Sequence, residues 1–547
     1  MSQQAARSKV LKIWGLALLV AAGTARAAEI PVSPKVVPVP EAAPVEVKDG
    51  AVLLSVDDAV EIALRRNLGL TVERYTRDQT DQAVLANLGI YDLNLNGEAS
   101  ASSRSSLSLS SLNGSESEDQ VLNAGFSQLL PVGGTFSLGF NNSRTKDNSS
   151  NQSFNPGYSS GLSFTYNQPL LRNFGRFSTE HDLLVAQNNN LQSRTEFERQ
   201  VINTVQQVIN AYWNLVGARQ QLIVAQESLT LAKQLHDRNR IQVDVGTMAP
   251  LELVQSEAAI ASNEEQIIRA QQAVGDAEDV LRQLLNLPAG PLWQAEIRPT
   301  TDPVMDRVAI NLDEAIQAAL DSRPEIKRQE LAIAQADIES RFAREQMKPS
   351  LDLRLSYNAT GTGGDQVVRD PVTGEVTGVI SGGYGDALSQ VTGLDFTGWS
   401  ARLLFNYPLQ NRAARARSTS ADIILTRERV ALDELRQVTL TEVRQAARRV
   451  DTAAKSIDAA MVSREFQLKN LDAQKKKYEN GMSTNFEITR IQQDVTQARS
   501  NVVTAVVNYR TALAEYYRVT GRLLSNQGVT IEDPAQPIDR GIFWFWR

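Results

Sequence analysis

Two very long helical runs, each broken once by a glycine turn, constrain the fold more than any other feature of the sequence. The first extends from about His181 to Pro288 and breaks at Val245-Gly246-Thr247-Met248. The second extends from about Ser418 to Leu524 and breaks at Asn480-Gly481-Met482-Ser483-Thr484. No proline lies between His181 and Val245, and at about 1.5 Å per residue such a helix is roughly 95 Å long. We therefore expect two long helical hairpins rather than a globular core.

Each hairpin is expected to form an antiparallel coiled coil. Apolar residues recur along the first helix at i, i+3 and i+4 spacing. They are Val201, Val205, Val208, Ile209, Tyr212, Trp213, Val216, Leu222, Ala225, Leu229, Ala232 and Leu235. The spacing is heptad-like, as in coiled coils. One hairpin cannot bury this stripe alone, so we expect it to pack against the other hairpin and against other subunits.

Three landmarks recur in the same order and predict an internal duplication. The helix start at residues 54–64 matches residues 310–320, with Ser55 and Asp58 spaced as a capping box. The turn at Gly246 matches that at Gly481, and Pro169 matches Pro408. The period is about 240 residues, which is a domain rather than the short unit of a solenoid.

The N-terminus predicts export. Residues 1–27 have a basic start, a short apolar core and an Ala-Arg-Ala cleavage site, as in secretory signals. A single membrane anchor is the alternative, but the core is too short to span. Residues 28–50 are expected to be a Pro-rich extended leader. We then assign residues 51–300 to the first repeat, 301–527 to the second, and 528–547 to an aromatic-dense C-terminal tail.

After each opening helix the apolar period changes from 3.6 to 2. Leu351, Leu353, Leu355 and Tyr357 alternate with polar residues, and the same pattern recurs at residues 401–407, 93–99 and 162–167. One face is apolar and the other small and polar, which is typical of a membrane barrel with a wet interior. A soluble β-sandwich with one wet face is the alternative.

The number of strands is not fixed by the sequence. Two further alternating runs, residues 122–126 and 136–140, are either an outer hairpin or additional wall strands. Residues 361–398 are Gly-rich and are expected to form a long loop. Two strands per half give a minimum of four, which cannot close a barrel. Because open strand edges are not tolerated in lipid, several chains would have to share one barrel.

Composition argues against catalysis. The chain has no cysteine, so disulfides, thiolate metal sites and a lipid-modified cysteine are excluded. Only His181 and His236 supply imidazole, and His236 is expected on a polar helix face rather than at a metal. The sequence lacks phosphate-binding and nucleophile motifs, so we expect no cofactor and no enzyme activity. The net charge of −7 argues against nucleic-acid partners.

The residues at the junctions resemble a known family. Prolines mark the swaps, the points where the chain changes from strand to helix or from helix to strand. They lie in Asn167-Gln168-Pro169-Leu170-Leu171, Met347-Lys348-Pro349-Ser350-Leu351 and Asn406-Tyr407-Pro408-Leu409. With the two glycine turns and the duplicated element order, the chain resembles the TolC-like outer-membrane factors, which are exit ducts of Gram-negative efflux pumps and type I secretion systems. Residues 90–93 lack the proline often found at that swap in the family.

This resemblance implies a mainly α-helical homotrimer with a membrane β part. Three chains would share a twelve-stranded barrel in the outer-membrane lipid, continuous with a periplasmic α-barrel. A periplasmic adaptor would link it to an inner-membrane pump or ABC transporter. The resemblance places adaptor contacts at the tips and the aperture near the second tip. The tip residues are Gly246, Thr247, Pro250, Gly481, Ser483 and Thr484; the aperture residues are Tyr478, Glu487 and Arg490.

Two details of the second tip carry expectations of their own. Relatives often have two aspartates at the aperture, whereas this chain has Glu487 and Arg490, which could pair at i, i+3. Pro250 suits a fixed first hairpin, and the second tip lacks proline, so the second hairpin is expected to move. A periplasmic coiled-coil adaptor and a monomeric porin are the alternative functions, and the cargo cannot be inferred.

Overall fold

The computed structural model describes residues 47–48, 51–107, 114–149, 152–302, 307–370, 375–480 and 482–531. The expected signal, most of the leader and the last sixteen residues, 532–547, lie outside this part, and so does Gly481.

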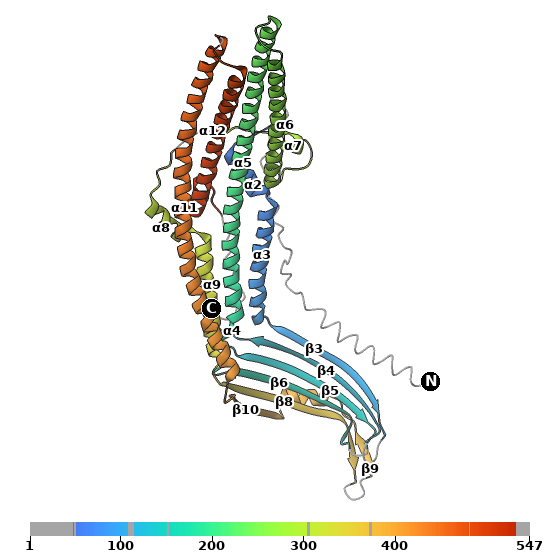
Figure 1. Cartoon of the computed structure of the whole chain (residues 1–547). Coiled ribbons are helices and arrows are strands. Elements are labelled where there is room, and N and C mark those ends of the chain that lie inside the picture. The colour runs from blue at the N-terminus through green and yellow to red at the C-terminus, as the bar shows by residue number, and fades with distance from the viewer. Residues whose placement is uncertain are drawn as a thin grey trace, which may run out of the picture. The chain divides into compact units, whose positions relative to one another are not determined.

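Two helical hairpins dominate the molecule, as the sequence predicts (Figure 1). The first consists of α5 (His181–Asp244) and α6 (Leu251–Leu285), the second of α11 (Arg412–Glu479) and α12 (Asn485–Val519). Helix α5 has 64 residues and α11 has 68. Helix α11 starts at Arg412, which is before the expected start at Ser418. Helix α5 also packs against α12, which joins the two hairpins side by side.

Shorter helices accompany the long ones. Near the large sheet, α3 (Leu68–Leu88) packs against α5, and α9 (Pro324–Glu345) packs against both α5 and α11. Helix α2 (Val56–Arg66) starts with the predicted capping box, in which the Asp58 amide donates to Ser55 Oγ at 3.1 Å. The remaining short elements are α4 (Arg176–Thr179), α7 (Pro291–Gln294), α8 (Leu312–Ser322), α10 (Tyr384–Gly393), α13 (Leu523–Asn526) and the 3₁₀ helix η1 (Gly89–Tyr91).

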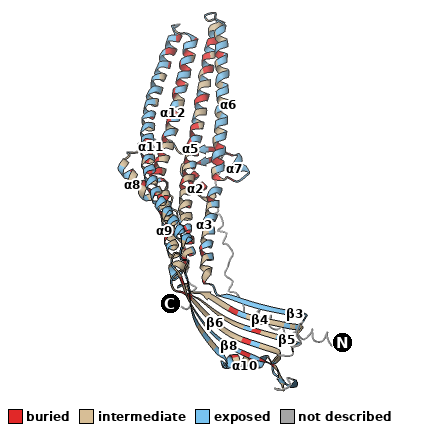
Figure 2. Cartoon of the chain, turned by 60° about the horizontal axis from the view of Figure 1, so that its bottom comes forward, coloured by how far each residue is buried: buried red, intermediate tan, exposed pale blue. Residues whose placement is uncertain are grey.

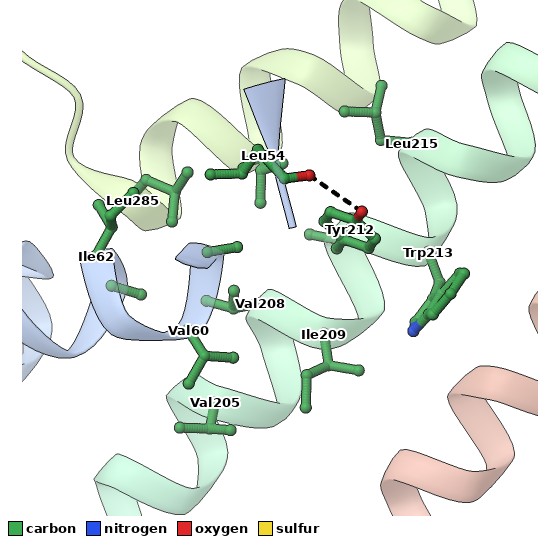
Figure 3. Packing of buried hydrophobic residues seen from close by; sticks show 14 of the residues in the cluster. Leu54, Val60, Ile62, Val205, Val208, Ile209, Tyr212, Trp213, Leu215 and Leu285 are labelled. Atoms are coloured by element: carbon green, nitrogen blue, oxygen red, sulfur yellow. Dashed lines mark hydrogen bonds between the residues drawn. The ribbon is translucent and has the colours of Figure 1, made fainter. Parts of the chain in front are cut away.

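The main core surrounds the middle of α5. A small sheet of β1 (Val47–Lys48), β2 (Ala51–Leu54) and β7 (Glu296–Pro299) lies beside it, with β2 parallel to β7. Tyr212 of α5 is fully buried and donates to the Leu54 carbonyl oxygen at 3.1 Å (Figure 3). Its hydroxyl also accepts from the Thr301 amide at 2.9 Å. This core holds the start of the first half against the end of the first hairpin.

A second, larger sheet is fully antiparallel and runs in the order β10-β8-β6-β5-β4-β3. Its strands are β3 (Asn94–Ser105), β4 (Glu116–Leu129), β5 (Thr135–Asp147), β6 (Phe154–Pro169), β8 (Ser350–Arg369) and β10 (Thr397–Asn406). A short strand, β9 (Val376–Ile380), pairs with the far end of β8. Figure 2 shows that buried residues concentrate on the helices, while most of this sheet is exposed or half-buried in the single chain.

The structure settles one open expectation about this sheet and corrects another. The extra alternating runs form strands β4 and β5, so six strands lie on the path, whereas the sequence required a minimum of four. Residues 361–398 are not simply a loop, because β8 continues to Arg369 and α10 follows. Gly361 serves close packing, since a Cβ there would overlap the Ala387 carbonyl oxygen of α10. Glycine in a strand often marks such a close approach.

Among the described helices, none combines the length and the apolar character that a membrane-crossing helix requires.

Candidate functional site: the hairpin tips

The first tip is a tight glycine turn. Helix α5 ends at Asp244, and Gly246 follows with φ +77°, a left-handed conformation that favours glycine. The Thr247 amide donates to the Gln242 carbonyl oxygen at 2.9 Å, and the Thr247 hydroxyl donates to the same oxygen at 3.0 Å. Pro250 then precedes α6 with helical φ and ψ. The predicted turn residues therefore lie at the end of the first hairpin.

The second tip is capped from both sides. The Met482 amide donates to the Lys477 carbonyl oxygen at 2.9 Å, which closes the end of α11. Thr484 is the N-cap of α12, and its hydroxyl accepts from the Glu487 amide at 3.3 Å. The Glu487 carboxylate accepts from Ser483 Oγ at 3.1 Å. An acidic residue in the first turn also suits the positive end of the helix dipole.

A polar network joins the two tips within the chain. Tyr478 of α11 donates its hydroxyl to Asn239 Oδ1 of α5 at 2.7 Å. Asn239 Nδ2 donates to Asn485 Oδ1 of α12 at 2.9 Å. Asn485 Nδ2 donates to Glu252 Oε2 of α6 at 3.1 Å. The network therefore links all four long helices at one level. We call Tyr478, Asn239, Asn485 and Glu252 the tip network.

The two amides of the network are shielded from water. Asn239 is 0% exposed and Asn485 2% exposed. Leu235, Tyr478 and Ile488 form an apolar cluster beside it, with Met248 packed against them. Hydrogen bonds are stronger in such surroundings, and an unpaired amide would be costly. Opening this contact therefore requires that the amides find new partners, such as water.

Charge adds little to the contact at the tip. Arg238 and Glu479 form an ion pair at 2.9 Å, but about half of each side chain is exposed, so its contribution is small. Burial, and next the nearby Glu252 carboxylate, raise the pKa of Tyr478, while Arg238 lowers it. The phenol is therefore protonated at neutral pH and acts as a hydrogen-bond donor.

The structure brings some of the predicted aperture residues together and separates others. Tyr478 lies at the centre of the tip network. The expected pairing of Glu487 with Arg490 is wrong, because the Glu487 carboxylate instead accepts from Gln474 Nε2 at 2.7 Å. Arg490 is exposed and forms no ion pair within the described part of the chain. The N-cap geometry turns Glu487 back toward its own hairpin, which accounts for the difference.

The three predicted swap prolines lie at strand ends. Pro169 ends β6, Pro349 directly precedes β8, and Pro408 follows β10 by two residues. The segment after Pro169 is bonded to the start of β8, since the Leu170 amide donates to the Leu351 carbonyl oxygen at 2.7 Å. The Arg172 amide donates to the Pro349 carbonyl oxygen at 3.3 Å. These prolines therefore lie at the junction between the sheet and the helices.

Sequence reasoning missed Asn239, Asn485 and Glu252. Asn239 could have been found, because it continues the apolar stripe four residues after Leu235. A single Asn in an apolar seam commonly fixes register between coiled-coil helices. Nothing local to Asn485 or Glu252 marks them, since their partners lie more than 200 positions away. Within the described residues, no cluster of His, Asp and Glu could hold a metal ion.

Comparison with known proteins places this architecture in a family of membrane channels. A family model described as outer membrane efflux protein matches residues 135–287 and 315–522. These two segments make up more than half of the sequence, and the chain belongs to the outer membrane efflux protein family.

Solved structures share the fold at low sequence identity. The CmeC outer membrane channel of Campylobacter jejuni aligns with a TM-score of 0.61 and 15% identity, covering 86% of each chain. The outer membrane protein VceC of Vibrio cholerae gives 0.61 and 12%, covering 85% of this chain and 96% of VceC. The MtrE outer membrane channel of Neisseria gonorrhoeae, in its open state, gives 0.58 and 17%, with 88% and 97% covered. No curated protein matches the chain.

Proposed function

We propose that this chain is the outer-membrane exit duct of a tripartite efflux or type I secretion system in a Gram-negative bacterium. Three copies would form a passive conduit from the periplasm to the exterior. The family membership carries this proposal. A duct of this kind performs no catalysis, and an inner-membrane pump would supply the energy. A periplasmic adaptor protein, the alternative suggested by the coiled coils, has no observation in its favour once the family is known.

The large sheet supports a shared barrel. Its path ends at β3 on one side and β10 on the other. Both end strands have an edge without a partner strand in the described part of the chain. Unpaired strand edges are too costly to leave open in lipid. Pairing β3 of one copy with β10 of the next would remove both of these end edges and close the wall.

An internal duplication accounts for the element order. Each half has an opening helix pair, strands and one long hairpin, in that order. The capped starts at Ser55 and Asn311 occupy matching positions, and each cap accepts from an amide three residues later. We infer that the two hairpins are equivalent parts that have diverged at their tips.

The tip is the proposed point of control. Family members work with periplasmic adaptors and inner-membrane pumps, and the two hairpin ends would be the adaptor-binding surface. Exposed apolar residues gather there, with Val245 68%, Leu251 64% and Met482 69% exposed. Binding of an adaptor at these residues would compete with the tip network and let the second hairpin move outward.

To test the proposed duct, the full chain is expressed in a Gram-negative bacterium, outer membranes are isolated and the protein is purified in detergent. We expect a species with the mass of three copies that conducts ions in planar bilayers. A soluble single-copy protein without conductance would refute the duct. Adding a purified partner adaptor should raise the conductance if the tips are its docking surface.

A further inference from the structure

We infer that hairpin β4–β5 forms part of the membrane wall, so that the pore of the assembled protein has eighteen strands. This inference rests on the proposed trimer, because six strands in each of three copies give eighteen. The sequence resemblance implied twelve, and the two added strands per chain widen the exit.

The strongest evidence is one continuous apolar row across all six strands. The register places Leu95 opposite Phe126, Phe126 opposite Leu138, and Leu138 opposite Phe164. Phe164 then lies opposite Tyr357, and Tyr357 opposite Trp399. Residues in directly opposed positions share one face of a sheet. The added strands therefore present apolar side chains at the same depth as the other four.

The opposite face carries a matching polar row. Asn94 lies opposite Ser127, Ser127 opposite Ser137, and Ser137 opposite Thr165. The row continues through Ser356 and Ser400, whose hydroxyls are 2.7 Å apart. An apolar outer face with a small polar inner face is the pattern of a membrane barrel. A hairpin standing in water outside the membrane would not need this alternation.

Strands β5, β6 and β8 also leave the apolar band at the same level. Two residues beyond Phe140, Leu162 and Ala359, the row becomes Asn142, Ser160 and Gly361. Ser160 donates to Asn142 Oδ1 at 2.6 Å. Tyr384 of α10 donates to the same oxygen at 2.9 Å, so α10 covers this polar level. Strand β5 thus crosses the same apolar depth as β6 and β8 before it reaches polar surroundings.

The turn between β4 and β5 is built into the junction with the helices. Gly133 has φ +87°, and a Cβ there would lie 2.7 Å from the Asn173 carbonyl oxygen. The Val132 carbonyl oxygen accepts from the Gly175 amide and from Gln168 Nε2, both at 3.1 Å. The turn is therefore held at the helix end of the sheet, level with the ends of the neighbouring strands.

Barrel diameter grows roughly linearly with strand number, so eighteen strands give about 1.5 times the diameter of twelve. The membrane exit would then be wider than the resemblance implies. Control of cargo size would fall to the periplasmic tips, and the exit itself would admit bulky solutes.

Depth measurements test the position of the hairpin. The chain has no cysteine, so single nitroxide labels can be placed without background. Leu138→Cys should match Phe164→Cys, with access to oxygen in lipid and protection from a water-soluble nickel chelate. Ser137→Cys should match Thr165→Cys, with the reverse preference. A water-exposed label at Leu138 beside a lipid-exposed label at Phe164 would overturn the inference. Water exposure at both would instead refute the membrane duct itself.

Distance measurements test the strand number. Labels on Thr165→Cys in the three copies should be about 1.5 times as far apart as in a twelve-stranded barrel. Deleting residues 107–147 would join β3 to β6 through residues 148–153, and the distance should fall by about a third. An unchanged distance in an assembled deletion variant would refute the wider wall. If that variant does not assemble, the distance in the full chain decides, and a twelve-strand value there would refute it.

Discussion

Asn239 shows how one amide can hold two helical hairpins together. It sits fully buried in the seam of α5, accepts from Tyr478 and donates to Asn485. Its position in the seam follows the sequence pattern, but its partners come from the other half of the chain. Local sequence therefore indicates that a polar residue is buried there, and only the fold reveals what it binds.

Replacing Tyr478 by Phe should loosen the tip. The change removes the hydroxyl that donates to Asn239 and leaves a buried acceptor without its donor, at a cost of about 1–3 kcal/mol. We expect a higher open probability in bilayer recordings of the proposed trimer. Tyr75→Phe, at an exposed site on α3, is the matched control and should behave like the parent. Equal conductance of both variants would remove Tyr478 from the gate.

Alkaline pH should loosen the same contact. Burial raises the pKa of Tyr478 in this structure, which the proposed gate takes as the closed tip, above that of an exposed tyrosine, which is near 10. Below about pH 10 the Tyr478 phenol is protonated in both the closed and the open tip, so its hydrogen bond to Asn239 is intact. Above about pH 10 the phenol loses its proton in the open tip before it does so in the closed tip, and this difference favours opening. Conductance should be flat to about pH 9 and rise beyond about pH 10, and Tyr478→Phe should abolish the rise.

At the scale of elements, the core around α5 joins segments that lie far apart in the chain. The Leu54 carbonyl oxygen accepts from both Tyr212 and the Thr300 amide. The Thr301 amide, in contrast, has the Tyr212 hydroxyl as its acceptor. Loss of that hydroxyl therefore affects the two backbone groups unequally, because Leu54 retains a partner.

Tyr212→Phe should therefore destabilise this core by about 1–3 kcal/mol, since the Thr301 amide loses its acceptor. Thermal unfolding followed by circular dichroism should show a lower midpoint than in Tyr75→Phe. Gating should stay unchanged, because the tip network is elsewhere on α5. A midpoint equal to that of the control would mean that water replaces the hydroxyl.

The elements differ in how far the sequence predicts them. The long helices were predicted because their periodicity extends over many turns. Helix α10 was missed because its surroundings are rich in glycine, which suggests a loop. In the fold, Gly361 and Gly363 are instead where α10 approaches β8 most closely. Strands β4 and β5 were recognised as alternating runs, but their partners depend on the whole sheet.

At the scale of the whole molecule, the two faces of the large sheet face different solvents in the proposed assembly. Leu355→Arg places a charge on the apolar face, in the row of Tyr166 and Ala401. A charge in mid-membrane costs about 2–4 kcal/mol, so less trimer should reach the outer membrane. Ser356→Arg, on the polar face, should be tolerated. Equal trimer yield in membrane fractions would contradict this orientation of the sheet.

The parallel pairing of β2 with β7 also sets an order of events during biogenesis. The Val56 amide bonds to Thr301 Oγ1 across a separation of 245 residues. Strand β2 can therefore pair early with β1, but its parallel partner β7 is not available until the entire first hairpin has been synthesised. Such distant pairings form slowly, and the waiting segment is exposed meanwhile. The core around Tyr212 can therefore be completed only after synthesis has reached Thr301, because a shorter chain lacks part of β7 or the amide that bonds to Tyr212.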